Sequence, residues 1–187
     1  MNIILFGPPG AGKGTQAKFL IRKTNGYQVS TGEMLRNEIK KNSDIGKLIT
    51  HDMNNGRFVS DEIVNELIKT YVFDNQKKNK LIFDGYPRSL SQAKNLDILL
   101  KESNQNIDHI FFLNVNKNTI IERIKKRKTE ENRSDDELDT ILKRYDTYME
   151  TTRPVLDFYS KNLNFHEIDG SQKIDEITSK IEVFITA

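Results

Sequence analysis

The stretch that decides the fold is Gly7-Pro8-Pro9-Gly10-Ala11-Gly12-Lys13-Gly14-Thr15, which follows the apolar run Ile3-Ile4-Leu5-Phe6 and precedes a helix-like segment from Gln16 to Ile21. A strand, a glycine-rich turn and a helix start in this order describe a phosphate-binding loop. Glycines let the backbone curl so that successive N–H groups face an anion, and the helix N-terminus adds partial positive charge. Lys13 supplies a mobile charge for the outer phosphates. The alternative, an ordinary glycine turn, is disfavoured by the spacing and the lysine.

The composition indicates a single globular domain. The chain has 187 residues, of which 36% are hydrophobic and 30% charged, and this is enough to bury a core. No apolar run approaches the roughly 20 residues that a membrane helix needs. The first apolar run lacks a basic leader, so we interpret it as a strand rather than a signal peptide. The net charge of +2 is too small to indicate nucleic-acid binding.

The chain contains no cysteine, which excludes disulfides and thiolate metal sites. The three histidines, His51, His109 and His166, stand singly, and none has another histidine at i+4. We therefore interpret them as surface or partly buried side chains rather than zinc ligands. The expected compartment is the cytoplasm. A monomer is the expected state, because no long apolar surface stripe demands a partner.

Hydrophobic periodicity predicts strands that alternate with helices. The expected strands are 2–6, 27–30, 80–85, 109–115 and 165–168. The expected helices are 14–24, one capped by Ser30 or Thr31, one between 43 and 54, one after Ser60, and then 89–102, 119–127, 135–149, 155–161 and 174–185. Residues 128–134 are expected to form a polar loop. This order is typical of an α/β fold with a parallel sheet covered by helices on both faces.

Asp84 ends the third expected strand, where a buried charge is costly without a partner. In a phosphate-loop fold this position lies next to the loop, so hydrated Mg²⁺ on the phosphates is the natural partner. A turn or helix-cap aspartate is the alternative. Farther along, Arg123 and Arg127 are four residues apart on one expected helix face. Like charges at this spacing destabilise a bare helix, which favours an anion between them; a solvated basic face is the alternative.

Three motifs resemble those of the nucleoside monophosphate kinases, and above all those of the adenylate kinases. The phosphate loop has the narrower spelling G-x-P-G-x-G-K-G-T, in which Gly14 follows Lys13 and the hydroxyl comes at Thr15. The segment Asp84-Gly85-Tyr86-Pro87-Arg88 resembles the family's D-G-[FY]-P-R, in which the bond before proline is cis. The segment Thr31-Gly32-Glu33-Met34-Leu35-Arg36 resembles its acceptor-side motif. The resemblance extends from Asn2 to about Glu176.

The resemblance implies a three-layer P-loop kinase fold with a parallel central sheet, a helical insert for the acceptor nucleotide at 30–59 and a short lid at 126–136. It implies catalytic roles for Lys13, Asp84, Arg88, Arg123, Arg133 and Arg144. It implies ATP binding by Gly10, Ala11, Gly12, Lys13, Gly14, Thr15, Arg123, Arg127 and Gln172. It implies AMP binding by Thr31, Arg36, Arg57, Phe58, Val59, Gly85, Tyr86, Pro87, Arg88, Gln92, Arg133 and Arg144. Mg²⁺ would be held near Thr15 and Asp84 through water.

The expected reaction is reversible phosphoryl transfer, in which ATP and AMP give two ADP. No general base is needed, because the second pKa of a phosphomonoester is about 6 and the acceptor oxygen is ionised at pH 7. A uridylate/cytidylate or sugar kinase is one alternative, against which Thr31 and Gln92 speak, because the uridylate/cytidylate kinases usually carry alanine and asparagine there. A GTPase-type switch is the other, and the chain lacks that class's N-K-x-D segment. The expected partners are ATP, AMP and ADP, without nucleic acid, membrane or structural zinc.

Overall fold

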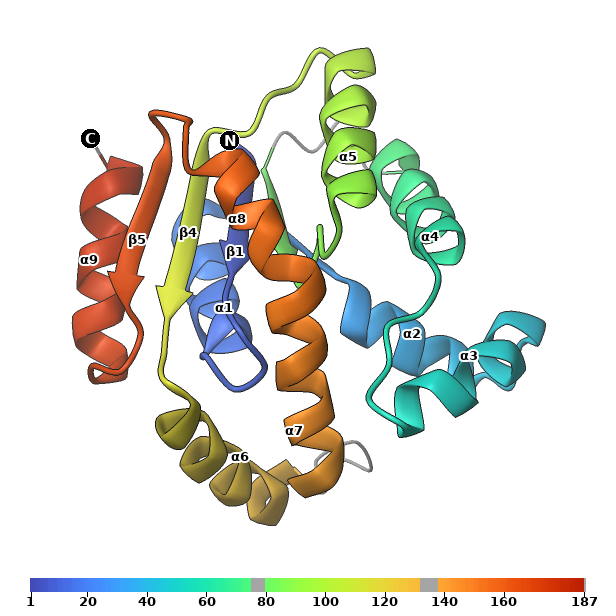
Figure 1. The fold of residues 1–187 in the computed structure, drawn as a ribbon. Helices are drawn as coiled ribbons and strands as arrows, with labels where there is room; N and C mark the ends of the chain where they lie inside the picture. The colour runs from blue at the N-terminus through green and yellow to red at the C-terminus, as the bar shows by residue number, and fades with distance from the viewer. Residues whose placement is uncertain (75–79, 132–137, 187) are drawn as a thin grey trace.

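Five parallel strands form one sheet in the computed structural model, which describes residues 1–74, 80–131 and 138–186 (Figure 1). The strand order is β2-β3-β1-β4-β5. Their bounds are β1 (Ile3–Phe6), β2 (Tyr27–Ser30), β3 (Leu81–Asp84), β4 (His109–Asn114) and β5 (Phe165–Asp169). Every neighbouring pair is parallel. The predicted parallel sheet is therefore confirmed, and each predicted strand lies within two residues of its observed bounds.

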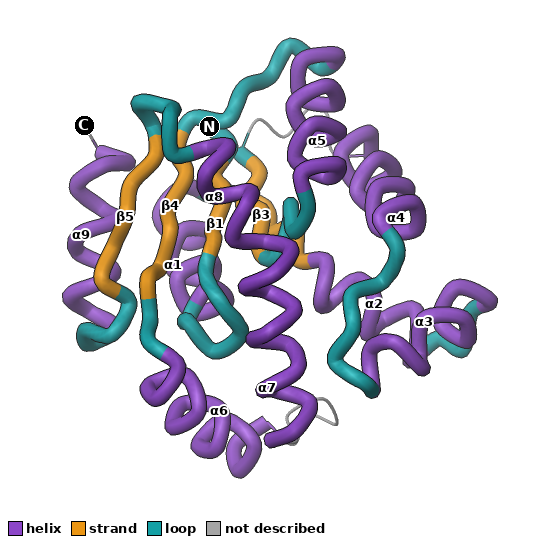
Figure 2. The backbone as a smooth tube through the Cα atoms, viewed as in Figure 1, coloured by secondary structure: helices purple, strands orange, loops and turns teal. Residues whose placement is uncertain are grey.

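Helices cover both faces of the sheet, as Figure 2 shows. Successive residues of a strand point to opposite faces, and β1 supplies both cores. Ile3 and Leu5 pack with α1 (Lys13–Thr24) and α9 (Ile174–Thr186). Ile4 and Phe6 pack with α4 (Asp61–Asp74), α5 (Leu90–Glu102) and α8 (Arg153–Tyr159). Burial on both faces explains why β1 is a continuous apolar run rather than an alternating one.

Two helices, α2 (Thr31–Lys40) and α3 (Asp44–Asn54), follow β2 and lie to one side of the sheet (Figure 1). Both begin with a serine cap. The Ser30 hydroxyl accepts a hydrogen bond from the Glu33 N–H at 3.4 Å, and the Ser43 hydroxyl accepts one from the Gly46 N–H at 3.0 Å. Ser30, rather than Thr31, is therefore the cap of α2. The insert proposed at 30–59 comprises these helices and the segment that follows them.

Helix α6 (Lys117–Glu131) is longer than expected. The sequence predicted a helix at 119–127 and a polar loop from Lys128, and the second part is wrong as far as Glu131. The physical reason is that this stretch contains neither glycine nor proline, so its polarity alone does not end the helix. The rest of the loop, 132–134, lies outside the described residues.

The expected break between helices at 149 and 155 is also absent. Helix α7 (Leu138–Thr147), a π-helical turn η1 (Tyr148–Thr152) and α8 follow one another without interruption. Pro154 has no N–H and its ring clashes with the preceding turn of an α-helix. The wider π turn immediately before it accommodates this residue while the chain stays helical. The expected gap at 150–154 is therefore helical.

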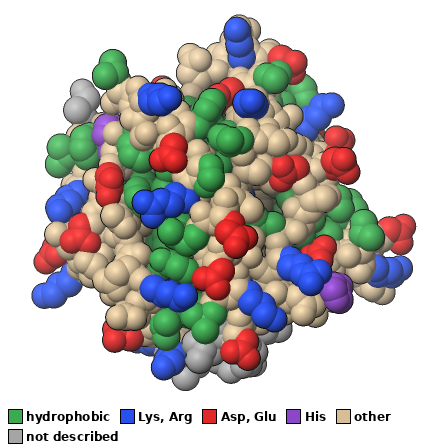
Figure 3. Space-filling model, viewed as in Figure 1, with side chains coloured by type: hydrophobic (Ala, Val, Ile, Leu, Met, Phe, Trp, Pro, Cys, Tyr) green, Lys and Arg blue, Asp and Glu red, His purple; other side chains and the backbone are tan. Residues whose placement is uncertain are grey.

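Figure 3 shows the surface from the same side as Figure 1, and on this face basic and acidic side chains are interspersed without a broad area of one charge. Among the residues that the structure describes, no helix combines the length and the apolar character needed to cross a membrane.

Candidate active site

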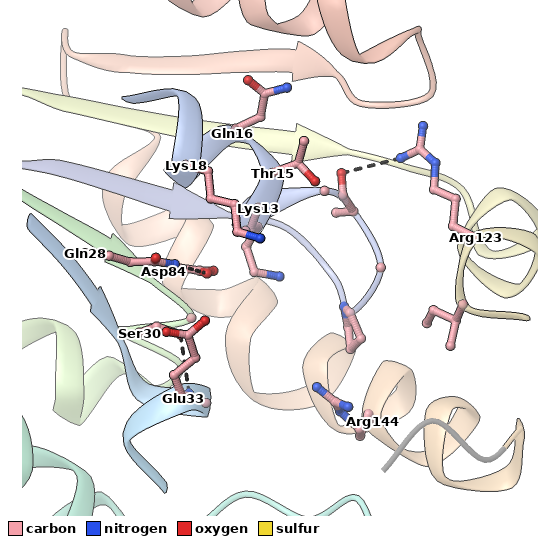
Figure 4. A pocket seen from close by; sticks show the side chains of 18 of the residues that line it. Lys13, Thr15, Gln16, Lys18, Gln28, Ser30, Glu33, Asp84, Arg123 and Arg144 are labelled. Atoms are coloured by element: carbon pink, nitrogen blue, oxygen red, sulfur yellow. Dashed lines mark hydrogen bonds between the residues drawn. The ribbon is translucent and has the colours of Figure 1, made fainter. Parts of the chain in front are cut away.

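The carboxyl ends of β1, β2 and β3 open onto a cleft of about 500 Å³ (Figure 4). The phosphate loop lines one side of it, and Gln28, Ser30, Asp84 and Arg88 line the other. A recess of about 50 Å³ shares Lys13, Arg88 and Arg144 with the cleft and adds Phe58, Pro87, Tyr148 and Thr152. Parallel sheets place binding sites at the carboxyl ends of their strands, so the cleft lies where the topology predicts it.

The phosphate loop is held in a tight curl by glycines at positive φ. Gly10 has a φ of +81°, and a Cβ added there would lie 2.9 Å from the Ile124 side chain of α6. Gly12 precedes α1 with a φ of +97°, and no side chain caps that helix. The start of α1 therefore faces the cleft with its backbone N–H groups available to an anion. The Lys13 ammonium donates to the carbonyls of Gly7 at 2.6 Å and Pro8 at 3.0 Å.

Asp84 lies against this loop at the end of β3. Its carboxylate accepts a hydrogen bond from the Gln28 amide at 3.1 Å, and a Cβ built on Gly14 would lie 3.7 Å from the same oxygen. Thr15 is exposed in the same cleft. Carboxylate and hydroxyl oxygens are hard donors that suit Mg²⁺, which keeps several waters and uses one or two protein ligands. Among the described residues no group of three or more His, Asp or Glu could hold a metal, which agrees with so sparse a protein ligand set.

Arg88 is held in the cleft by contacts with Gly85 and Phe58. Its Nε donates to the Gly85 carbonyl at 2.7 Å, and its guanidinium lies 4.8 Å from the centre of the Phe58 ring. Gly85 has a φ of +77°, and a Cβ there would lie 2.9 Å from an Arg88 nitrogen, so only glycine permits this approach. The Tyr86–Pro87 bond is cis, as expected. Arg88 lines the cleft, where a guanidinium is a suitable ligand for a carboxylate or a phosphate.

Two residues expected to contact the acceptor base, Thr31 and Gln92, are buried, at 3% and 2% exposure. Neither lines the cleft or the recess. The Thr31 hydroxyl donates to the Gly85 carbonyl at 2.8 Å. The Gln92 carboxamide accepts from the Arg88 N–H at 2.7 Å and donates to Asp61 at 2.7 Å. In this structure both side chains hold the segment that carries Arg88.

The other expected acceptor-side residues are divided between cleft and core. Arg36 and Arg144 line the cleft, and Phe58 and Pro87 line the recess. Arg57 is exposed. Val59 and Tyr86 are 6% and 1% exposed and belong to the core beneath the site. The Tyr86 hydroxyl donates to Asn65 at 2.8 Å, and burial raises the pKa of Tyr86 to about 12.

On the other side of the loop, Arg123 of α6 connects three segments. Its guanidinium donates to the carbonyls of Ala11 at 3.4 Å, Ser171 at 3.5 Å and Gln172 at 3.5 Å. The loop between β5 and α9 is therefore next to the phosphate loop, as Gln172 was expected to be. The Gln172 side-chain oxygen is buried with no hydrogen-bond partner among the described residues. The side chain of Arg127 and the whole of Arg133 lie outside the described residues.

Four site residues were missed by the sequence analysis. Gln28 bonds to Asp84, Asp61 bonds to Gln92, and Tyr148 and Thr152 line the recess. Gln28 and Asp61 carried a usable signal, because a glutamine within a strand and an aspartate at a helix start often have polar partners. Tyr148 and Thr152 carried none, because their direction depends on the π turn.

Comparisons with known proteins agree with this geometry. A family profile described as adenylate kinase matches residues 5–164. The adenylate kinase of Pelagibacter ubique is 48% identical to this chain over 97% of both sequences. That of Maricaulis maris is 39% identical over 97% of this chain and 96% of its own length, and that of Mycoplasma capricolum is 40% identical over 98% and 100%. With phosphate loop, arginine-lined cleft and full-length relatives in agreement, this chain belongs to the adenylate kinase family.

Proposed function

We propose that this chain transfers the γ-phosphoryl group of ATP reversibly to AMP, giving two ADP, in the cleft between the phosphate loop and Arg88. The observation that carries the proposal is that both Lys13 and Arg88 line the cleft and the recess. Each is a phosphate ligand of a different kind, a mobile ammonium on one side and a fixed guanidinium on the other. A cleft with phosphate ligands on two sides suits transfer between two nucleotides.

The donor phosphates bind to the backbone of the loop and to the start of α1. Lys13 gives up its bonds to the Gly7 and Pro8 carbonyls and turns to the outer phosphates. Arg123 fixes the loop against Ser171 and Gln172, which supports a site for the adenine of ATP beside that segment. By their motif, Arg127 belongs to the donor side, and Arg133 belongs to the lid and reaches toward the acceptor phosphate.

The acceptor phosphate binds to Arg88, Arg36 and Arg144, all of which line the cleft. Gly85 and Thr31 hold Arg88 in place, and Phe58 lies beneath its guanidinium. The attacking oxygen of AMP is already ionised at pH 7, so the site needs no general base. Its work is to hold two phosphates in line and to neutralise the charge that they share.

Asp84 and Thr15 would hold Mg²⁺ through water, and the ion would neutralise charge on the phosphates of ATP. Gln28 orients Asp84 through its 3.1 Å hydrogen bond. Addition of a chelator should abolish turnover and leave the melting temperature of the nucleotide-free protein unchanged, since we propose no structural metal. Cooperative unfolding on chelation would contradict this separation.

Gln92 and Thr31 select adenine. The segment that contains Arg57 and Val59 lines the acceptor side of the same base pocket. Gln92 has two amide hydrogens and two carbonyl lone pairs, and the two hydrogen bonds in this structure use one of each. The remaining pair complements the N1 and N6 edge of adenine, as amides do on DNA. Bound nucleotide would reach this pair by an adjustment of the acceptor side.

The test is a coupled assay of ADP formation with ATP and, in turn, AMP, UMP, CMP, GMP or no acceptor. AMP should be used best, by at least about tenfold, which is the discrimination that one base-edge contact supplies. A preference for UMP or CMP would assign the chain to the uridylate/cytidylate type. Phosphate release without an acceptor would indicate a nucleotide switch. We further propose that the enzyme acts as a monomer in the cytoplasm.

A further inference from the structure

Asp61, the first residue of α4, joins α4 to the start of α5 through two hydrogen bonds. Its Oδ1 accepts from the Gln92 Nε2 at 2.7 Å, and its Oδ2 accepts from the Ser89 hydroxyl at 2.5 Å. Gln92 is 2% exposed, so its carboxamide has little access to water. The carboxylate is therefore a fixed neighbour of the buried Gln92 amide, which the family resemblance assigns to AMP binding.

This contact fixes which way round the carboxamide lies. A carboxylate only accepts hydrogen bonds, so the amide atom that faces Asp61 must be the nitrogen. On the other side, the Arg88 backbone N–H only donates, so the atom that faces it at 2.7 Å must be the oxygen. A flip of the Gln92 amide would place oxygen against carboxylate and N–H against N–H. The negative charge of Asp61 on one side and the N–H dipole of Arg88 on the other thus exclude the flipped state of the Gln92 amide.

The orientation matters because purine bases differ in the polarity of the same edge. Adenine presents an acceptor at N1 and a donor at its 6-amino group, whereas hypoxanthine presents a donor at N1 and an acceptor at its 6-oxo group. An amide that could rotate freely would satisfy either base, since a half-turn exchanges its donor and its acceptor. An amide fixed on both sides satisfies only one of them, and the other base leaves buried polar groups unpaired.

We propose that Asp61 is a positioning residue that makes the acceptor site select 6-amino over 6-oxo purine nucleoside monophosphates, by locking the Gln92 carboxamide. The inference rests on the proposed contact between Gln92 and the acceptor base. Asp61 itself lines neither the cleft nor the recess, so it acts on the base only through Gln92. Ser89 supports it from the far side of the carboxylate, and the same hydroxyl caps α5 by accepting from the Gln92 N–H at 3.1 Å.

The experiment compares AMP with IMP as acceptors at saturating ATP. Asp61→Ala should lower the AMP-to-IMP ratio of kcat/KM at least about tenfold, mainly through a higher KM for AMP, with the KM for ATP unchanged. Asp61→Asn keeps a carbonyl oxygen for the Gln92 nitrogen and should restore most of the ratio. Glu62→Ala is the matched control, because Glu62 is an exposed acid in the same helical turn and should leave the ratio unchanged.

Ser89→Ala provides a measurement that does not depend on the folding of Asp61→Ala. It loosens the carboxylate without removing it and should lower the ratio by a smaller factor. An equal loss of activity with AMP and IMP in both variants, or an unchanged AMP-to-IMP ratio in both, would overturn the inference. Asp61 would then only connect α4 to α5. Gln92→Ala separates the two levels of the account. If Gln92→Ala leaves the use of AMP unchanged, the proposed base contact itself is wrong. If Gln92→Ala raises the KM for AMP while Asp61→Ala leaves the AMP-to-IMP ratio constant, only the inference about Asp61 is rejected.

Discussion

At the scale of single residues, Asp84 shows how a neighbour in space completes a motif. It ends β3 beside the phosphate loop, and the amide of Gln28 from β2 donates to its carboxylate at 3.1 Å. The parallel register brings the ends of β2 and β3 together, with Ser30 opposite Asp84. This places the carboxylate toward the loop, where we propose that it meets hydrated Mg²⁺.

Asp84→Asn should therefore retain ATP binding and lose most turnover. The amide keeps the size of the side chain but removes the charge that a metal requires, so we expect a fall in kcat of about 10²–10³-fold, the range seen when one preorganised electrostatic group is lost. The dissociation constant for ATP should change by less than about tenfold, or 1.4 kcal/mol. Asp44→Asn, an exposed aspartate of α3, serves as the control. Near-normal turnover in Asp84→Asn would remove this residue from the site.

Residue identities in the loop and around Arg88 were predictable from the sequence, since their motifs are local. The burial and the hydrogen-bond partners of Thr31 and Gln92 were not predictable. Gln92 is bonded to a residue 31 positions earlier, and Thr31 to a carbonyl 54 positions later. Such partners come from the packing of α2, α4 and α5, which no local pattern encodes.

At the scale of elements, the π turn η1 positions the acceptor site. It directs Thr152 inward at 3% exposure, and the Thr152 hydroxyl donates to the Arg88 carbonyl at 3.0 Å. Together with the Gln92 carboxamide on the Arg88 N–H, this bond holds both backbone groups of Arg88. The extra residue of a π turn, a feature frequent at functional sites, thus supports Arg88, the proposed phosphate ligand.

Thr152→Val should raise the KM for AMP about fivefold, because it removes a hydrogen bond worth about 1 kcal/mol that helps to position Arg88. The KM for ATP should not change, and Thr152→Ser should restore the KM for AMP. The control is Thr151→Val, whose exposed hydroxyl bonds only to the Thr147 carbonyl in its own helix. Equal changes in the kinetics of both nucleotides would show that Thr152 stabilises the fold without positioning Arg88.

The elements themselves were largely predictable, because strands buried on both faces are continuous apolar runs and α2, α3 and α5 begin with a serine cap. The two wrong predictions, the loop from Lys128 and the gap before Val155, both lie where helical structure continues. Polarity after Lys128 and proline at 154 are signals against a helix, yet helical structure extends over both, because a chain without breakers continues to Glu131 and a π turn admits the ring.

At the scale of the whole molecule, stability should depend on pH through a histidine pair between β4, β5 and α9. The His109 Nδ1 lies 3.4 Å from the His166 Nε2, and the His166 ring stacks on Phe184 with centroids 3.9 Å apart. Burial lowers the pKa of both histidines, the neighbouring imidazole lowers that of His166 further, and Asp108 partly offsets the effect at His109. Both rings are therefore neutral in the folded protein at pH 7.

A histidine whose folded pKa lies below its unfolded value of about 6.5 binds fewer protons in the folded state. Its contribution to stability is complete above that value and is lost as the pH falls through the lowered folded pKa. The melting temperature should thus decrease as the pH is lowered from 7.5 to 5, and the decrease should be shallower in the His109→Asn, His166→Asn double variant. His51→Asn, at an exposed site, should keep the original slope. A double variant with an unchanged slope would refute the role of the pair.

The central claim is that donor and acceptor phosphates occupy one cleft, between Lys13 and Arg88. The most direct measurement is calorimetric titration with a bisubstrate analogue, two adenosines joined by a chain of five phosphates. The account predicts one molecule bound per chain, competition with ATP and with AMP, and a loss of affinity of at least about tenfold in both Lys13→Ala and Arg88→Ala, since each removes a charge-assisted phosphate contact. Binding that competes with only one nucleotide, or that withstands either substitution, would contradict it.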